Sequence, residues 1–210
     1  MNNAAQNIIK LEEETPMMQQ YITIKKEHPD SILFFRMGDF YEMFNEDATI
    51  ASQVLEIALT SRNKNKTNPT PMCGVPHHSS KSYIAKLVKS GKKVAICEQT
   101  EDPKLAQGLV KREVVRVVTP GTVLDGDLLD PKQNHFLVSI YSDKKGWGLA
   151  ALDITTGLFK VTELRGDNTE SLLADELEKL DPKEIILSEI NLKEDNKTKW
   201  LESWDHCLHY

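Results

Sequence analysis

The sequence predicts a mixed α/β fold in two domains. Short runs of alternating apolar and polar residues, typical of strands, are interleaved with segments of helical periodicity along the 210 residues. Residues 119–131 are rich in Gly, Pro and Asp, a composition typical of a connection between domains. With 40% apolar residues, a chain of this length can bury two small cores. We expect a first domain over 1–120, a linker over 121–133 and a second domain over 134–210.

The first domain opens with a predicted helix over residues 16–27. Thr15 is a favourable N-cap, and Pro16 suits the first helical position because that residue needs no backbone donor. Two apolar runs within residues 31–44 follow, and the turn composition of Gly38-Asp39 between them predicts a β-hairpin.

The rest of the first domain continues the alternation of helices and strands. Asn45 is a candidate N-cap for the next helix, and Gly91 is a candidate stop for the one after it. In order, we expect a helix over 46–57, a loop through Asn68-Pro69 and Pro71 that leads into a helix over 80–90, a strand over 93–98, a short helical turn after Asp102 and a strand over 113–119.

The second domain begins with three short alternating runs joined by turn sequences, which predicts an antiparallel meander. A helix follows, with Asp181-Pro182 as its stop signal, and then a buried strand. The predicted strands cover 136–141, 147–154, 158–164 and 184–187, and the helix covers 169–180.

The strand after the predicted hairpin turn carries an unusual pair of side chains. Because successive side chains alternate between the faces of a strand, Phe40 and Glu42 share one face while Tyr41 and Met43 share the other. An aromatic ring and a carboxylate therefore point to the same side, two residues apart.

The same residues also fit a different local structure. Asp39 followed by Glu42 matches a capping box, in which Glu42 would only fold back on the start of a helix, and Phe40 would be a core residue. The better helix start at Asn45 favours the strand.

Residues 35–44, Phe-Arg-Met-Gly-Asp-Phe-Tyr-Glu-Met-Phe, resemble the mismatch-recognition signature of the MutS family of DNA mismatch-repair proteins. Two further groups of residues agree with that family in order and spacing: 71–78, and 94–99 together with 114–122. The resemblance covers most of residues 13–124.

The resemblance implies roles for two side chains. Phe40 would stack on a mispaired or unpaired base from the minor groove, and Glu42 would hydrogen-bond that base. A carboxylate close to phosphates and partly buried has a raised pKa, so we hypothesise that Glu42 binds in a partly protonated form and donates to the base. Beside this pair the resemblance loosely suggests Met72, Pro76 and His77 as secondary DNA contacts; alternatively, their loop only forms a rigid turn.

Charge is distributed unevenly along the chain. The formal net charge is −6, yet residues 61–116 carry 12 basic and 4 acidic side chains. Such a segment can neutralise phosphates without reading bases. Arg62, Lys64 and Lys66 are the secondary candidates for phosphate contact; for any single one of them, an ordinary solvated position is the alternative.

The second domain resembles the opening of a ribonuclease H-like fold, which in the MutS family is the connector domain, here incomplete. The resemblance implies docking of a MutL-type partner. A rival hypothesis is a magnesium-dependent nuclease built on Asp153, although two-metal chemistry needs several convergent carboxylates and the neighbouring strand offers none. A protein-docking module alone would leave Phe40 and Glu42 unexplained.

Several classes of function are disfavoured by the sequence. Three scattered cysteines do not form a disulfide framework, and neither Cys73 with His77 and His78 nor Cys207 with His206 and His209 has the spacing of a four-ligand zinc site, so no metal is expected. No long apolar run or signal segment is present, which predicts a cytoplasmic protein without a membrane partner.

No Gly-x-x-x-x-Gly-Lys-Ser/Thr loop occurs in the sequence, so this fragment is expected to be no enzyme and to hold no cofactor. The resemblance implies a longer parent that is a DNA-dependent ATPase and a homodimer, with its ATP and magnesium sites beyond residue 210. The binding partner of this fragment and of the longer parent is expected to be double-stranded DNA with mismatches or small loops.

Overall fold

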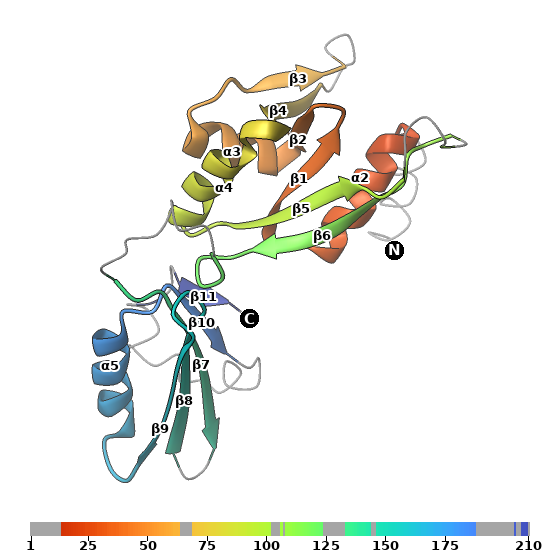
Figure 1. Cartoon of the computed structure of the whole chain (residues 1–210). Coiled ribbons are helices and arrows are strands. Elements are labelled where there is room, and N and C mark those ends of the chain that lie inside the picture. The colour runs from red at the N-terminus through yellow and green to blue at the C-terminus, as the bar shows by residue number, and fades with distance from the viewer. Residues whose placement is uncertain are drawn as a thin grey trace. The chain divides into compact units, whose positions relative to one another are not determined.

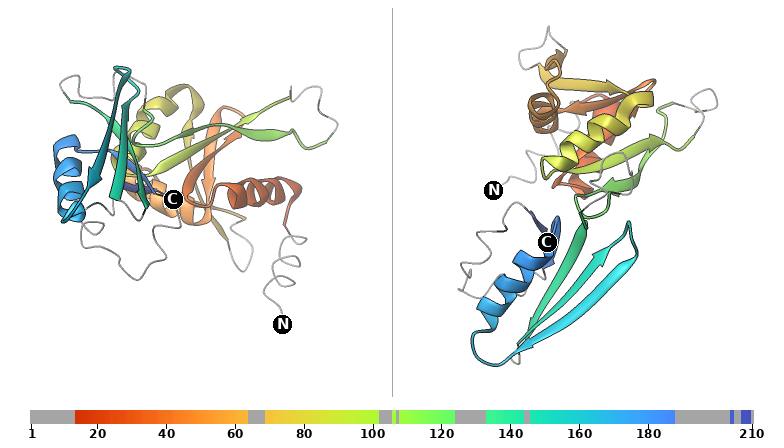
Figure 2. Two further views of the ribbon diagram at one scale, coloured as in Figure 1. Left: turned by 90° about the horizontal axis from the view of Figure 1, so that it is seen from below. Right: turned by 60° about the vertical axis from the view of Figure 1, so that its left-hand side comes forward.

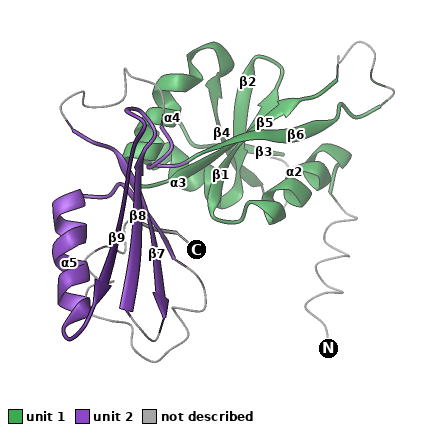
Figure 3. Ribbon diagram, turned by 60° about the horizontal axis from the view of Figure 1, so that its bottom comes forward, with its two compact units in different colours: residues 1–118 green, residues 119–210 purple. Residues whose placement is uncertain are grey.

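The chain folds into two compact units, residues 1–118 and 119–210 (Figure 3). The computed structural model describes residues 14–63, 69–101, 106, 108–123, 133–143, 146–187, 204 and 207–209. Much of the predicted linker, residues 124–132, lies outside this described part. The domain limits drawn from the sequence remain a prediction.

The first unit is built on a six-stranded mixed sheet with the order β3-β4-β2-β1-β5-β6. Strands β1 and β5 are parallel, and the other neighbours are antiparallel. The strands are β1 (Ser31–Met37), β2 (Phe40–Phe44), β3 (Thr60–Arg62), β4 (Thr70–Pro76), β5 (Lys93–Gln99) and β6 (Arg112–Val118).

Helices cover both faces of this sheet (Figures 1 and 2). On one face Tyr21 of α2 packs edge-on against Phe35 and Phe44, with ring centroids 5.5 and 4.9 Å away. On the other face the Cys73 thiol donates to the Ala48 carbonyl of α3, 3.4 Å away. The helices are α2 (Pro16–Glu27), α3 (Asn45–Leu55) and α4 (Ser80–Lys89), the last preceded by the short 3-10 helix η1 (His77–Ser79).

The predicted first helix and hairpin are confirmed. Helix α2 has its predicted bounds, and its first turn is capped by Thr15 Oγ1, which accepts from the Met18 amide at 3.4 Å. Strands β1 and β2 pair Met37 with Phe40 across the two-residue turn, where Gly38 has a φ of 57°. The capping-box alternative is wrong, because Glu42 lies in the middle of β2.

The bounds of the second helix differ from the prediction. It begins at Asn45, which has a φ of 53°. Its N-cap is Phe44, and no side chain caps the first turn, so the predicted capping by Asn45 is wrong. It ends at Leu55 because Glu56 takes a left-handed φ of 57°. No glycine marks this stop, so the sequence carried no signal for it.

The loop predicted through Asn68-Pro69 and Pro71 is wrong where the structure describes it. Residues Thr70–Pro76 form β4, and the unpredicted β3 pairs with its first half. Pro71 and Pro76 lie near the two ends of β4, where missing backbone donors cost the ladder least. The helical turn predicted after Asp102 falls on residues outside the described part.

The second unit is a five-stranded mixed sheet with the order β11-β10-β7-β8-β9, and α5 (Thr169–Leu180) packs on one face (Figure 1). The predicted antiparallel meander and the returning strand, which is parallel to β7, are confirmed, and so is the mixed α/β class. Its strands are β7 (Phe136–Asp143), β8 (Gly146–Asp153), β9 (Leu158–Arg165), β10 (Glu184–Leu187) and β11 (Leu208–His209). Within the described residues, no helix is both long and apolar enough to cross a bilayer.

Candidate nucleic-acid interface

Phe40 is an exposed aromatic at the tip of the hairpin. It is the first residue of β2, directly after the turn, and 46% of its surface is accessible, whereas Phe44 on the same face is 1% accessible. Its cross-strand neighbours are Met37 and Pro76. The ring is therefore accessible from solvent at the tip of the hairpin.

Glu42 lies on the same face as Phe40, between Phe35 of β1 and Gly74 of β4. Its Oε2 atom is buried and has no hydrogen-bond partner among the described residues. The Arg62 guanidinium is 3.8 Å from that oxygen, which is close enough for attraction and too far for a hydrogen bond. Burial raises the pKa of Glu42, and the charges of Arg62 and Arg112 offset part of that rise.

Gly74 leaves the space that both site residues occupy. A Cβ atom at this position would lie 3.3 Å from the Tyr41 carbonyl oxygen, 3.7 Å from Glu42 Cγ and 3.9 Å from Phe40 Cδ1. The contact with the carbonyl oxygen is tighter than most real Cβ contacts and involves backbone, which cannot rotate away. The missing side chain at Gly74 therefore allows β4 to lie close to β2 beside Phe40 and Glu42.

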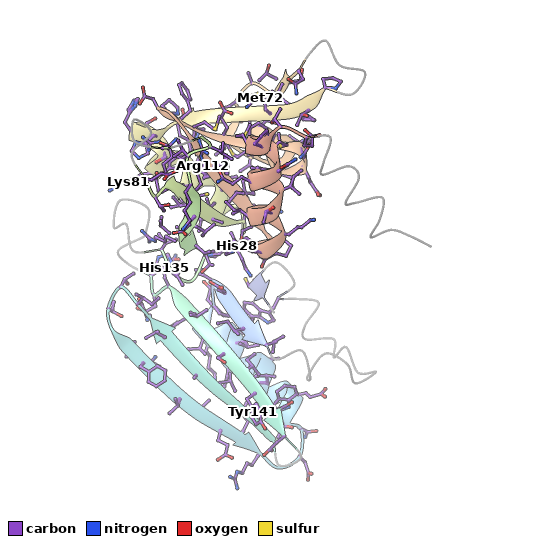
Figure 4. The ribbon with its side chains drawn as sticks, turned by 90° about the vertical axis from the view of Figure 1, so that its right-hand side faces the viewer. His28, Met72, Lys81, Arg112, His135 and Tyr141 are labelled. Carbon is purple, nitrogen blue, oxygen red and sulfur yellow. The ribbon has the colours of Figure 1, made fainter. Side chains whose placement is uncertain are left out.

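Arg112 is buried on the same face and connects three elements (Figure 4). Its Nε donates to the Arg36 carbonyl at 2.7 Å, and its Nη1 donates to Gln20 Oε1 and to the Val110 carbonyl, both at 3.0 Å. The guanidinium lies 4.9 Å from the centre of the Phe35 ring. The sequence showed Arg112 only as one of many basic residues, and no local signal marks it as buried.

The opposite face of the hairpin carries a polar cluster. The Tyr41 hydroxyl donates to Glu98 Oε1, and Arg36 Nη1 lies 3.8 Å from Glu98 Oε2. His77 joins the cluster, with its ring 5.4 Å from the Tyr41 ring. Of these four residues the sequence singled out only His77, as a DNA contact.

The secondary candidates are spread over different surroundings. Arg62 and Pro76 lie beside Glu42 and Phe40, while Met72, labelled in Figure 4, packs against the core cluster that includes Tyr21 of α2. The His77 ring is on the face away from Glu42, where it contacts Tyr41. Lys64 and Lys66 lie outside the described residues.

Asp153 closes a turn in the second unit. Its Oδ1 accepts from the Thr155 amide at 2.9 Å, from the Thr155 hydroxyl at 2.6 Å and from the Thr156 amide at 3.3 Å, and its Oδ2 accepts from the His135 amide at 3.3 Å. Burial would raise the pKa of Asp153, but these four hydrogen bonds outweigh it and the pKa is lowered. All four hydrogen-bond donors are groups of the protein, so the Asp153 carboxylate has a structural role in holding the turn.

No metal site emerges from the part of the chain that the structure describes: it holds no cluster of three or more His, Cys, Asp or Glu side chains able to bind a metal ion. Cys73 is buried, and its thiol donates to the Ala48 carbonyl, so this cysteine is a packing residue of the core. Cys207 is buried as well, with its thiol 3.5 Å from the Pro182 carbonyl, while His206 lies outside the described residues.

Models of known protein families match both units of the chain. The family model described as MutS domain I matches residues 15–127, and the model described as MutS domain II matches residues 135–207. The chain therefore belongs to the MutS family and comprises its N-terminal domains I and II.

Relatives in several bacteria support this assignment. The chain is 55% identical over 185 residues to the DNA mismatch repair protein MutS of Desulforamulus reducens, which covers 88% of this chain and 21% of that protein. It is 57% identical over 179 residues to the protein of the same name from Desulforapulum autotrophicum, covering 84% of this chain and 20% of that protein. The protein of that name from Acetivibrio thermocellus is 54% identical over 188 residues, 90% of this chain and 22% of its own length. The chain thus spans about a fifth of the length of these relatives.

Proposed function

We propose that this chain recognises mispaired or unpaired bases in duplex DNA, as the N-terminal part of a longer mismatch-repair protein. The observation that carries the proposal is the exposed ring of Phe40 at a hairpin tip, two residues from a carboxylate oxygen without a hydrogen bond. The relatives, all named as DNA mismatch repair proteins, support it.

Phe40 acts as a wedge in the minor groove. An apolar side chain that enters a base step must unstack it and kink the duplex, which costs a few kcal/mol and costs less where pairing is already defective. Stacking of the ring on a base returns about 1 to 3 kcal/mol and accepts any base, because each base has a π face. Preference for mismatches thus arises from deformability and needs no sequence reading.

Glu42 makes the polar contact to the displaced base. Its buried oxygen has an unused hydrogen-bonding site, and a base edge supplies either a donor to the carboxylate or an acceptor for the protonated acid. Burial, which raises the pKa of Glu42, and approach of the phosphates both favour the protonated form.

Basic side chains of the first unit contribute affinity without selectivity. Arg62 is the described candidate beside the site, and exposed lysines of α4 add positive charge elsewhere on the unit. Binding should therefore weaken as salt rises. Lys64, Lys66, Met72, Pro76 and His77 remain secondary candidates for contact.

The remaining functions belong to a full-length protein, meaning a chain with the additional length that the relatives have. For it we propose ATP hydrolysis with magnesium in domains outside this chain, a homodimer, docking of a MutL-type partner on the connector domain and a cytoplasmic location. These follow from the family assignment alone.

The test is equilibrium binding of the full-length protein to a mismatched and a matched duplex of the same length, at one fixed salt concentration. Phe40→Ala should reduce the ratio of the two affinities by about fivefold to 150-fold, which is the loss of about 1 to 3 kcal/mol of stacking. Binding to the matched duplex should change little. Phe159→Ala, which removes a ring that is 62% exposed in the second unit, is the matched control. An unchanged ratio in Phe40→Ala would overturn the proposal.

A second variant tests the protonated form of Glu42. Gln keeps a hydrogen-bond donor and loses the charge, so Glu42→Gln should retain mismatch binding near the wild-type level and should bind matched duplex more tightly. Mismatch binding far below wild type would show that the ionised carboxylate is the active form.

A further inference from the structure

A side-chain cluster lies on the face of the recognition hairpin opposite to Glu42. It consists of Arg36, Tyr41, His77 and Glu98, named here the hairpin brace. Tyr41 and Arg36 both reach Glu98 on β5, a strand separated from β2 by β1. The cluster therefore connects the strand that begins with Phe40 to β5, two positions away in the sheet.

The tip of the hairpin is weakly held by its backbone alone. Strand β2 has five residues, and Phe40 is opposite Pro76, which has no amide hydrogen to donate. Two further hydrogen bonds hold the turn: the Arg36 side chain donates from Nε to the Gly38 carbonyl at 2.6 Å, and the backbone amide of His77 donates to the Asp39 carbonyl at 2.8 Å.

The side chains of the brace also pack against one another. The Arg36 guanidinium lies 5.7 Å from the centre of the Tyr41 ring, and the His77 Nε2 atom lies 3.7 Å from Glu98 Oε1. Tyr41 is 3% accessible, and its ring centre is 5.6 Å from that of Phe34. Burial and the bond to Glu98 raise the pKa of Tyr41, so its hydroxyl remains a donor at neutral pH.

A wedge works only if its support does not yield. When a ring enters a base step, the resistance of the duplex acts back on the hairpin, and a hairpin that tilts leaves the ring outside the stack. Functional side chains have to be held to about half an ångström by the groups behind them. Tyr41 follows Phe40 directly, so fixing the Tyr41 side chain fixes the backbone that carries the wedge.

We propose that the hairpin brace positions Phe40 for insertion into DNA, with Tyr41 and Glu98 as positioning residues that do not touch the base. The inference rests on the proposed function. It assigns the selectivity for mismatches partly to a contact on the far side of the sheet from the DNA-reading side chains.

The experiment is a double-mutant cycle in the full-length protein with Tyr41→Phe, Glu98→Leu, which removes the acceptor, and both changes together. Tyr41→Phe removes one hydroxyl and retains the ring contacts. Each single change should lower the ratio of mismatched to matched affinity by about threefold to tenfold, as expected for the net loss of one ordinary hydrogen bond. The double variant should be no worse than the worse single variant, because both changes break the same contact. Tyr141→Phe, at a position 64% exposed in the second unit, is the control.

A fluorescent adenine analogue placed next to the mismatch gives a second signal, because its emission reports base unstacking. In Tyr41→Phe this signal should fall together with the affinity ratio while the melting temperature and matched-duplex binding stay near wild type. Equal losses for both duplexes would show a purely structural role and overturn the inference, and so would an additive cycle.

Phe40→Ala, measured in parallel, separates the two proposals. If Phe40→Ala loses selectivity for mismatches and Tyr41→Phe retains it, the positioning role of the hairpin brace is refuted and the proposed function stands. If Phe40→Ala retains selectivity, the proposed function itself fails.

Discussion

At position 42 a carboxylate lies where a neutral side chain would be more stable. Its Oε2 atom is buried without a hydrogen bond, and Arg62 at 3.8 Å compensates its charge only in part. An unmade buried hydrogen bond destabilises the fold, so such a group calls for an explanation. This unsatisfied oxygen agrees with the base contact proposed for Glu42.

The stability of the first unit should depend on the ionisation of Glu42. Because its pKa is raised, the folded unit holds the proton more tightly than the unfolded chain, and stability is lost as the pH rises through that pKa. Glu42→Gln should increase the free energy of unfolding at pH 7 by about 1 kcal/mol, the low end of the cost of an unsatisfied buried group. The gain should vanish below about pH 4, the range in which an unfolded glutamate protonates. Urea unfolding at several pH values measures it; a gain that is constant with pH contradicts the assignment.

Gly74 sets the position of both site residues through its missing side chain. Gly74→Ala would bring a Cβ to 3.3 Å from the Tyr41 carbonyl oxygen, so the strands must separate slightly and shift Phe40 and Glu42. We expect a loss of about 1 kcal/mol in stability, typical of mild overpacking, and a lower mismatch preference.

The matched control for this change is Gly148→Ala in β8. There the new Cβ would be 3.9 Å from the nearest atom, the Tyr141 carbonyl oxygen, which is an ordinary contact. Duplex-binding ratios and thermal unfolding compare the two variants. Equal effects would show that Gly74 has no special place in the site.

At the scale of single elements, local signals predicted what local interactions determine. The Gly38-Asp39 turn and the alternation around it gave the hairpin, and Thr15 with Pro16 gave α2 with its observed bounds. Strand β4 was missed because two prolines and a glycine read as loop, and only its neighbours β2 and β3 make it a strand.

The turn between β8 and β9 is an element held by one carboxylate. Asp153→Asn should cost about 1 to 3 kcal/mol at pH 7, because four donors lose a charged acceptor. The pKa of Asp153 is lowered in the folded unit, so its stabilisation is complete above the unfolded pKa, about 4, and is lost as the pH falls below it.

The difference in stability between wild type and Asp153→Asn should therefore shrink below pH 4. Unfolding followed by tryptophan fluorescence at pH 7 and pH 3 measures this difference. Thr162→Ser, in β9 away from the turn, serves as a mild control. A difference that is the same at both pH values would show that the Asp153 charge is unimportant.

At the scale of the whole chain, the two units have separate cores. Leu177 lies fully buried in the core of the second unit, and Leu33 lies fully buried in that of the first. All three tryptophans, Trp147, Trp200 and Trp204, belong to residues 119–210. Tryptophan fluorescence therefore reports the second unit, whereas circular dichroism reports both.

Leu177→Ala should destabilise the second unit by about 2 to 5 kcal/mol through the cavity it leaves. The fluorescence transition should move to lower denaturant, and a second transition, seen only by circular dichroism, should stay in place. Leu33→Ala should produce the opposite pattern. A single transition shifted equally by both variants would show that the units unfold as one.

The sequence by itself determined the fold class, the hairpin and the placement of Phe40 and Glu42 on one face of their strand. These depend on turn chemistry, helix caps and alternation, which act between residues a few positions apart. The family resemblance, too, was visible in short strings of residues, and the matches to MutS domains I and II confirm it.

Only the tertiary structure decided which side chains surround that face. Arg112 bonds to the Arg36 carbonyl across 76 positions of sequence, and Tyr41 bonds to Glu98 across 57. Pairing of strands brings such residues together, and no local pattern encodes which residues will meet. The burial of Arg112, the unsatisfied oxygen of Glu42 and the hairpin brace all arise in this way, because each depends on contacts made between strands that are distant in the chain.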